Sequence, residues 1–144
     1  GNLFVAGFIG SPQMNFVDAT CKVVGDKVYL VAGPSEIELP PAKAKKLIEG
    51  GYAGKTVVLG IRPEDVHDEQ MFIETSPNTV IEAKIRVYEM LGAEVFLYFD
   101  YEGSSMTARV DPRTTARTGD TVTFAFDAEK IHVFDKETEK TITN

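Results

Sequence analysis

The sequence predicts a mainly β fold, arranged as one small β-barrel or as a pair of barrels. Val, Ile, Thr, Phe and Tyr cluster in short runs that Gly, Pro, Asp and Asn interrupt, which is the pattern of strands joined by turns. Helical patterns are confined to two short segments. Many short strands at close spacing with few helices are typical of small barrels. With 144 residues, the chain has the length of one compact domain or of two small lobes.

Strands are expected wherever β-branched and aromatic residues form a run between turn residues. Gly25-Asp26 and Glu102-Gly103 lie between alternating runs and predict hairpin turns. The predicted strands are Asn15–Val24, Lys27–Val31, Glu36–Leu39, Thr56–Ile61, Val80–Leu91, Glu94–Tyr101, Met106–Val110, Thr121–Asp127 and Ile131–Asp135.

Two short helices are expected. The first covers Leu3–Ile9, an apolar stripe that ends before Gly10. The second covers Ala42–Glu49, because Pro41 favours a helix start and Gly50 favours a helix end.

Composition excludes several classes of function. The net charge of -7 argues against a nucleic-acid partner, since phosphates require clustered Lys and Arg. The most aromatic strand, Glu94–Tyr101, carries Asp100 and runs into Glu102, so it lacks the basic stacking surface of an OB-type nucleic-acid binder. No apolar run approaches the roughly 20 residues that cross a bilayer, so we expect no direct membrane insertion. The single Cys21 favours a reducing compartment.

Two segments resemble parts of a nucleotide site and fail on inspection. Gly54-Lys55-Thr56 looks like the end of a phosphate-binding loop, but Glu49 stands where that pattern needs its first glycine, and a strand follows instead of a helix. Val95–Phe99 leads into Asp100, but Tyr101 follows where a catalytic glutamate would stand. We therefore expect no ATPase chemistry and no catalytic residue in this chain.

Metal and nucleophile patterns are also weak. His67 and His132 are the only histidines and, with one cysteine, offer no zinc-type spacing. An acidic cluster lacks the spacing of a calcium loop and is expected to be a solvated turn. It consists of Glu64, Asp65, Asp68 and Glu69. We expect no metal and no cofactor in this chain.

Six segments, in order and over almost the whole chain, carry a family resemblance: 4–12 (FVAGFIGSP), 14–16 (MNF), 60–66 (GIRPEDV), 91–94 (LGAE), 119–122 (GDTV) and 130–135 (KIHVFD). They resemble the C-terminal regulatory domain of the ATP-binding subunits of carbohydrate-import ABC transporters, the maltose and multiple-sugar importer ATPases. Glu139 departs from the resemblance, since glycine is expected after Thr138.

The resemblance implies an OB-fold-like (TOBE) β-barrel pair with two short helices. Residues 1–13 would be a linker helix from a preceding ATPase domain, and 14–144 the OB-like regulatory domain. Its first lobe would comprise about 14–66 plus 119–144, and its second lobe about 78–112.

The resemblance also implies a setting. The parent subunit would use ATP and magnesium and work in the cytoplasm, peripheral to the inner face of the cell membrane. Expected partners are a second copy of this chain, the membrane-spanning transporter subunits through the parent, and a cytoplasmic regulatory protein. We expect a weak symmetric dimer through exposed apolar side chains of Val80–Leu91 and Glu94–Tyr101.

Five residues in these segments are candidates for a structural or regulatory role: Arg62, Pro63, Glu64, Phe16 and Glu94. Pro63 fixes its own φ and biases Arg62 toward extended geometry, so the strand should end there. Glu64 suits the first turn of a short helix. Arg62 is expected to brace the corner by pairing with a neighbouring carboxylate; direct contact with a ligand is the alternative.

A different function stays open alongside the regulatory one. Related barrels in other transporter ATPases sense small oxyanions, and the Arg62 corner with nearby backbone N–H groups would suit such a ligand.

Overall fold

The computed structural model describes residues 13–144 and consists of two antiparallel sheets with short helices between strands. The mainly β prediction is confirmed. The helix expected over Leu3–Ile9 lies outside the described residues, as does the 1–13 linker apart from Gln13, so both stay predictions.

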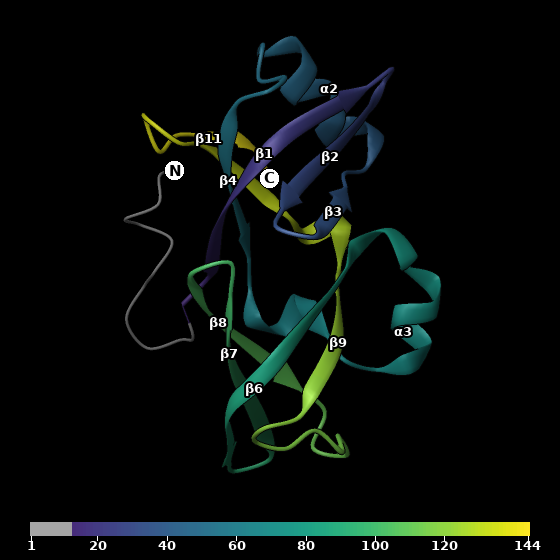
Figure 1. Ribbon diagram of the computed structural model, residues 1–144, viewed down its shortest axis with the longest axis vertical. Helices are drawn as coiled ribbons and strands as arrows, with labels where there is room; N and C mark the ends of the chain where they lie inside the picture. The colour runs from purple at the N-terminus through teal and green to yellow at the C-terminus, as the bar shows by residue number, and fades with distance from the viewer. Residues whose placement is uncertain (1–12) are drawn as a thin grey trace.

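The first sheet has the strand order β11-β10-β4-β1-β2-β3 and occupies the upper half of the molecule in Figure 1. Helix α2 (Pro41–Glu49) lies at its upper end, close to the predicted bounds. The strands are β1 (Asn15–Val24), β2 (Lys27–Ala32), β3 (Ser35–Glu38), β4 (Thr56–Ile61), β10 (His132–Asp135) and β11 (Thr141–Thr143).

The second sheet has the order β5-β9-β6-β7-β8 and forms the lower half (Figure 1). A second helix, α3 (Gln70–Thr75), packs beside β9 and was not predicted. The strands are β5 (Val66–His67), β6 (Val80–Leu91), β7 (Glu94–Tyr101), β8 (Ser104–Val110) and β9 (Thr121–Phe126). Three single-turn 3₁₀ helices complete the chain: η1 (Pro63–Asp65), η2 (Pro77–Thr79) and η3 (Ala128–Lys130).

Strand pairing divides the chain at a different place from the expected lobes. β9 lies within 119–144, which we assigned to the first lobe, yet it pairs with β6 along Val80–Lys84 and with β5. β9 joins the second sheet because its inward Phe124 and Phe126 meet the core beneath β6 and β7. The chain then returns to the first sheet through η3 and β10.

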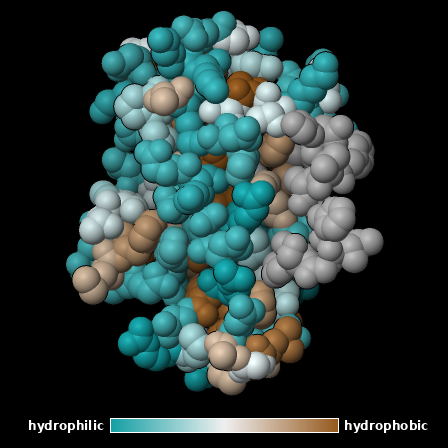
Figure 2. All heavy atoms as spheres, turned by 180° about the vertical axis from the view of Figure 1, so that it is seen from behind, coloured by the Kyte–Doolittle hydropathy of each residue, from teal (hydrophilic) through white to brown (hydrophobic). Residues whose placement is uncertain are grey.

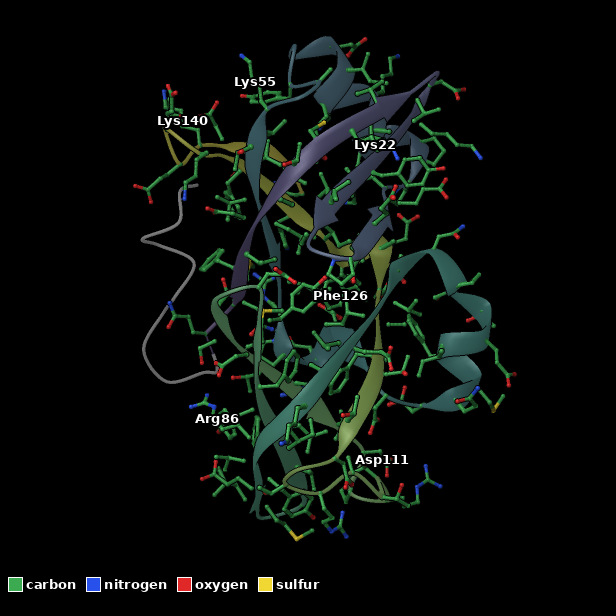
Figure 3. The ribbon with its side chains drawn as sticks, in the orientation of Figure 1. Lys22, Lys55, Arg86, Asp111, Phe126 and Lys140 are labelled. Carbon is green, nitrogen blue, oxygen red and sulfur yellow. The ribbon has the colours of Figure 1, made fainter. Side chains whose placement is uncertain are left out.

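Both sheets cover one continuous apolar core. Phe99 of β7 stacks on Phe124 of β9 with ring centroids 4.7 Å apart, and both rings are fully buried. Phe126 lies near the middle of the molecule, where the sheets meet, while the labelled charged side chains lie at its outside (Figure 3). Tyr101 crosses between the sheets and donates a buried hydrogen bond of 2.9 Å to the carbonyl of Ala32. The two halves are therefore packed as one unit.

Two turns show how backbone geometry selects residues. Glu102 (φ 47°) and Gly103 (φ 80°) both adopt left-handed geometry, which confirms the predicted hairpin turn between β7 and β8. Glu139 also has a positive φ of 61° in the β10–β11 turn. This conformation favours glycine, which explains why glycine is the residue expected there.

No helix within residues 13–144 is long and apolar enough to cross a membrane.

Candidate functional site

The corner where β4 ends carries three of the five candidate residues. Arg62 is extended (φ -76°, ψ 151°), and the buried Pro63 opens η1 directly after it. The N–H of Asp65 donates to the carbonyl of Arg62 at 2.9 Å and closes this turn. Glu64 lies in the first turn of η1, as expected. The strand end and the short helix predicted around Pro63 are confirmed.

The partner of Arg62 differs from the expected carboxylate. Its Nη1 donates to Nε2 of His132 at 3.2 Å, and no ion pair of Arg62 with an acidic side chain occurs among residues 13–144. Because a guanidinium only donates, Nε2 of His132 must accept, so Nδ1 carries the proton and donates to Oδ1 of Asn144 at 3.0 Å. Strand register explains this: His132 lies opposite Gly60, two residues before Arg62.

Phe16 packs over the same corner. Its ring meets Phe134 edge to face at 5.9 Å, and the two cover Gly60 together with Met14. A Cβ atom at Gly60 would lie 2.8 Å from Sδ of Met14 and 2.9 Å from the Phe134 ring, so a larger residue does not fit without movement. Phe16 is therefore a packing residue of the first sheet.

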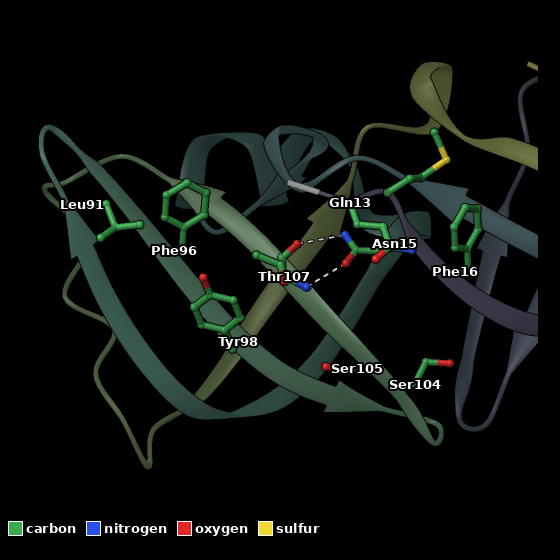
Figure 4. Close-up of a pocket in the computed structure, with 10 residues that line it drawn as sticks. Gln13, Asn15, Phe16, Leu91, Phe96, Tyr98, Ser104, Ser105 and Thr107 are labelled. Atoms are coloured by element: carbon green, nitrogen blue, oxygen red, sulfur yellow. Dashed lines mark hydrogen bonds between the residues drawn. The ribbon is translucent and has the colours of Figure 1, made fainter. Parts of the chain in front are cut away.

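Asn15 joins this corner to the second sheet through a strand-like contact. Its side-chain amide donates to the carbonyl of Thr107 at 2.9 Å, and its amide oxygen accepts from the N–H of Thr107 at 2.7 Å (Figure 4). Asn15 is 4% exposed, so these bonds are shielded from water. The amide satisfies the edge of β8 as a neighbouring strand would. We call Asn15, Phe16, Gly60, Arg62, Pro63, His132 and Phe134 the corner.

A groove of about 530 Å³ opens beside the corner, over the outer face of β7 and β8 (Figure 4). Its described lining carries hydroxyls, amides and aromatic rings but no charged side chain. Such a surface suits a neutral polar or apolar group and gives an oxyanion no cation to meet. The lining residues are Gln13, Met14, Asn15, Phe16, Leu91, Phe96, Tyr98, Ser104, Ser105 and Thr107.

A larger hollow of about 830 Å³ lies between α3 and the loop before β9 and is mainly acidic. Burial raises the pKa of the Asp68 carboxyl, although Oγ1 of Thr114 donates to it at 2.6 Å. The one guanidinium in its described lining, Arg113, bonds Asp111 through two nitrogens and lowers the pKa of that carboxyl. This hollow is therefore a poor site for an anion.

Glu94 is the first residue of β7, directly after the turn that follows β6. Its carboxylate is 3.7 Å from Nη1 of Arg109, and the side chains of Arg109 and Glu94 are 37% and 54% exposed. This position separates Glu94 from the corner, so the structure does not bring the five candidates together in one site.

The same end of the second sheet exposes apolar side chains. A β-bulge at Arg86 shifts the register between β6 and β7, so that Val87 lies opposite Tyr98 on the outer face. Without the bulge, Val87 would continue the buried series of Ile81, Ala83 and Ile85, because side chains alternate along a strand. Instead Val87 is 43% exposed, and Met90 and Leu91 are each 54% exposed. We call Val87, Met90 and Leu91 the exposed strip.

Figure 2 shows brown side chains gathered at the lower end of the molecule, where Figure 1 places the β6–β7 turn. The expected second contributor, β7, gives no exposed large apolar side chain, since Phe96 is only 6% exposed and Tyr98 is half-buried.

The acidic cluster seen in the sequence is divided by the fold. Asp68 faces Thr114, whereas Asp65 lies beside His67 and Asp127. Sequence reasoning missed this second grouping, because Asp127 is 60 residues or more away from its neighbours and only the pairing of β5 with β9 brings it there.

Two antiparallel sheets wrapped around one core, with a short helix between β3 and β4, define a small β domain of the OB type. The chain belongs to the TOBE domain family, whose sequence model matches residues 59–134. The model of a second family, the MalK OB fold domain, matches residues 10–66. The expected OB-like fold is confirmed.

Three relatives are named as ATP-binding proteins of sugar transport. The chain is 45% identical over 138 residues to the oligosaccharides import ATP-binding protein MsmX of Bacillus subtilis, covering 96% of this chain and 37% of that protein. It is 39% identical to the multiple sugar-binding transport ATP-binding protein MsmK of Streptococcus mutans, and 37% identical to the trehalose/maltose import ATP-binding protein MalK of Thermococcus litoralis. Each of these two matches covers 98% of this chain and 37% of the relative. The chain thus spans little more than a third of the length of these relatives.

A solved structure shares the fold at low identity. The cytoplasmic molybdate-binding protein ModG, solved with molybdate bound, superposes with a TM-score of 0.62 at 14% identity, covering 87% of this chain and 96% of that one. This likeness supports the fold.

Proposed function

We propose that this chain is the C-terminal regulatory domain of the ATP-binding subunit of a sugar-importing ABC transporter. The observation that carries the proposal is the match of 96–98% of the chain to a part of such subunits. The matched families are TOBE and OB domains, so the ATPase chemistry of the parent belongs to another part of it. The parent would bind ATP and magnesium on the cytoplasmic side of the membrane and reach the transporter subunits there.

We further propose that the domain holds two parent subunits together through a symmetric contact at the exposed strip. Val87, Met90 and Leu91 are apolar and exposed near the end of β6, Val87 and Leu91 on one face of the strand and Met90 on the other. Exposed apolar side chains of this kind commonly mark interaction surfaces. The net charge of -7 on each copy opposes a tight contact. A weak contact suffices, because a tether raises the effective concentration of the domains joined to it. A cytoplasmic regulatory protein is a further candidate partner.

A domain exchange tests the regulatory role. This chain would replace the matching segment of MsmX, and sugar uptake would be measured in cells that lack the native protein. Retained uptake with unchanged expression supports the proposal. Loss of uptake, with the hybrid folded and still hydrolysing ATP, would contradict it.

A second candidate function is the sensing of a small oxyanion, which the fold of the molybdate-binding protein favours. One hollow holds Lys84 and Arg86 beside Gly119, although Asp100 also lines it and lies 3.9 Å from Nε of Arg86. Thermal unfolding with molybdate, sulfate and maltose separates the candidates, since a ligand of the native state raises the midpoint. A rise with molybdate alone, lost in Lys84→Ala, would replace the regulatory proposal by the sensor.

A further inference from the structure

Three side chains of metal-binding type meet where β5 lies beside β9. Asp65, His67 and Asp127 each offer one candidate ligand atom, and these atoms all lie within 4.8 Å of one another. All three residues are half-buried. The grouping directly follows the corner along the chain, since the N–H of Asp65 donates to the carbonyl of Arg62.

The backbone pairing of β5 with β9 brings these three residues together. β5 pairs with β9 so that Val66 lies opposite Phe126 and His67 lies opposite Ala125. The N–H of Asp127 donates to the carbonyl of Asp65 at 2.9 Å, which extends the pairing by one residue. Asp65, the last residue of η1, thus lies across from Asp127, and His67 follows it two residues later in β5.

The imidazole of His67 is held in an orientation suited to a ligand. Its Nδ1 lies 3.1 Å from Oε2 of Glu69, and its ring stacks on Phe72 with centroids 4.0 Å apart. When the neutral ring donates Nδ1–H to Glu69, its lone pair resides on Nε2. A carboxylate that orients a histidine in this way is the usual outer partner of a metal-bound imidazole.

The charges around the grouping favour a cation. The Asp65 carboxylate accepts no hydrogen bond from residues 13–144, and the carboxylate of Asp127 lies beside it. Glu64 is a further negative charge near Asp65, and Lys130 is a positive one. Asp127 uses one oxygen to accept from the N–H of Glu129 at 3.2 Å, which leaves its other oxygen available. A divalent ion would relieve the repulsion between the two carboxylates.

We propose that Asp65, His67 and Asp127 form a binding site for a divalent transition metal, with Zn²⁺ as the preferred ion. One imidazole nitrogen and two carboxylate oxygens suit zinc better than magnesium or calcium, which prefer oxygen ligands alone. Three protein ligands leave a fourth position of the tetrahedron for water. The ion would join the end of η1 and β5 to the residue that follows β9, at the edge of the second sheet.

Thermal unfolding with zinc chloride tests the site. With zinc at about a hundred times its dissociation constant, the midpoint should rise by about 5–10 °C, and EDTA should reverse the rise. Asp65→Asn, Asp127→Asn and His67→Ala should each abolish most of the rise. Asparagine at 127 keeps an oxygen that caps η3, so this variant removes charge with little effect on the fold. His132→Asn removes the other histidine and should leave the rise intact.

An NMR titration of the wild-type chain gives a second measurement that does not depend on folded variants. Zinc should shift the amide signals of residues 65–67 and 125–127 and leave those near His132 unchanged. Three outcomes overturn the proposal: no rise in the midpoint, a rise that persists in all three site variants, or shifts centred elsewhere. The second of these would mark zinc as an adventitious ion only.

Discussion

The corner and the exposed strip lie on the same molecule but satisfy their side chains in opposite ways. In the corner, Asn15 completes the edge of β8, aromatic rings close over Gly60, and Arg62 finds His132. At the other end of the second sheet, the bulge at Arg86 turns Val87 outward, and Met90 and Leu91 are each 54% exposed. A region whose groups are all paired contributes stability. A region that leaves apolar groups exposed is suited to a partner, and this difference leads us to assign structure to the corner and association to the strip.

The largest effect is expected at Asn15. Asn15→Ala removes two shielded hydrogen bonds and leaves the N–H and carbonyl of Thr107 without partners, at a cost of about 2–4 kcal/mol in the free energy of unfolding. Urea denaturation measures it. Asn78→Ala is the control, since Asn78 makes only an exposed bond to Glu38 and should change stability by less than ~0.5 kcal/mol. If the two variants lower the free energy of unfolding equally, the hydrogen bonds of Asn15 do not give the corner its stability.

Gly60→Ala should be the next most costly change. The added methyl group meets Met14 and Phe134 at distances that require movement, so we expect a loss of about 1–3 kcal/mol. Adding Met14→Ala should recover part of this loss, because the two sites share the same space. Full additivity in a double-mutant cycle would show that crowding is not the cause.

Arg62→Ala should cost less than a buried charged pair would. Its bond to His132 is exposed and its partner is neutral, so about 0.5–1 kcal/mol is expected. A double-mutant cycle with His132→Ala should assign most of this loss of stability to the interaction between Arg62 and His132. If Arg62→Ala leaves stability unchanged but abolishes a partner's binding, Arg62 contacts the partner instead of bracing the fold.

Acid should weaken the far end of β10 in a defined direction. Hydrogen bonds, first from the N–H of Thr138 and then from Tyr52, lower the pKa of Asp135 to about 2. A depressed folded-state pKa stabilises above the unfolded value and loses that contribution as pH falls through the folded one. Asp135→Asn should therefore reduce the loss of stability between about pH 5 and pH 2. Identical acid curves for both proteins would refute this role.

Burial acts in the opposite direction at two other carboxyls. Burial raises the pKa of Asp65 and of Asp68 above the unfolded-state values. The folded state therefore takes up these protons more readily, and their uptake stabilises the fold as pH falls. Their replacement by asparagine should make the acid loss of stability steeper.

Sequence patterns predicted the long strands well and the short ones poorly. The bounds of β1, β4, β6 and β7 agree with prediction, because each is a long β-branched or aromatic run between turn residues. β5 has two residues and β11 three, too few for any periodicity, and the six-residue α3 has no cap signal.

The contacts of the candidate residues depend on register, which a single sequence does not carry. Pro63 could be placed at the strand end from its own geometry, but His132 reaches Arg62 only because β10 pairs with β4. In the same way Asp127 reaches Asp65 only through β9. No glycine or proline marks the bulge at Arg86 in the sequence, so the exposure of Val87 could not be predicted either.

The contrast between corner and strip is tested most directly by sedimentation velocity on the wild-type chain and two matched variants. Leu91 and Val24 are almost equally exposed, at 54% and 53%, but only Leu91 belongs to the strip. In ~1 M salt, where the Debye length of about 3 Å screens the net charge, the wild-type chain should dimerise as its concentration approaches about 1 mM. Val24→Glu should dimerise equally, and Leu91→Glu should stay monomeric with unchanged stability. A wild-type chain that stays monomeric, or a Leu91→Glu variant that dimerises as well as Val24→Glu, would contradict the assignment of association to the exposed strip.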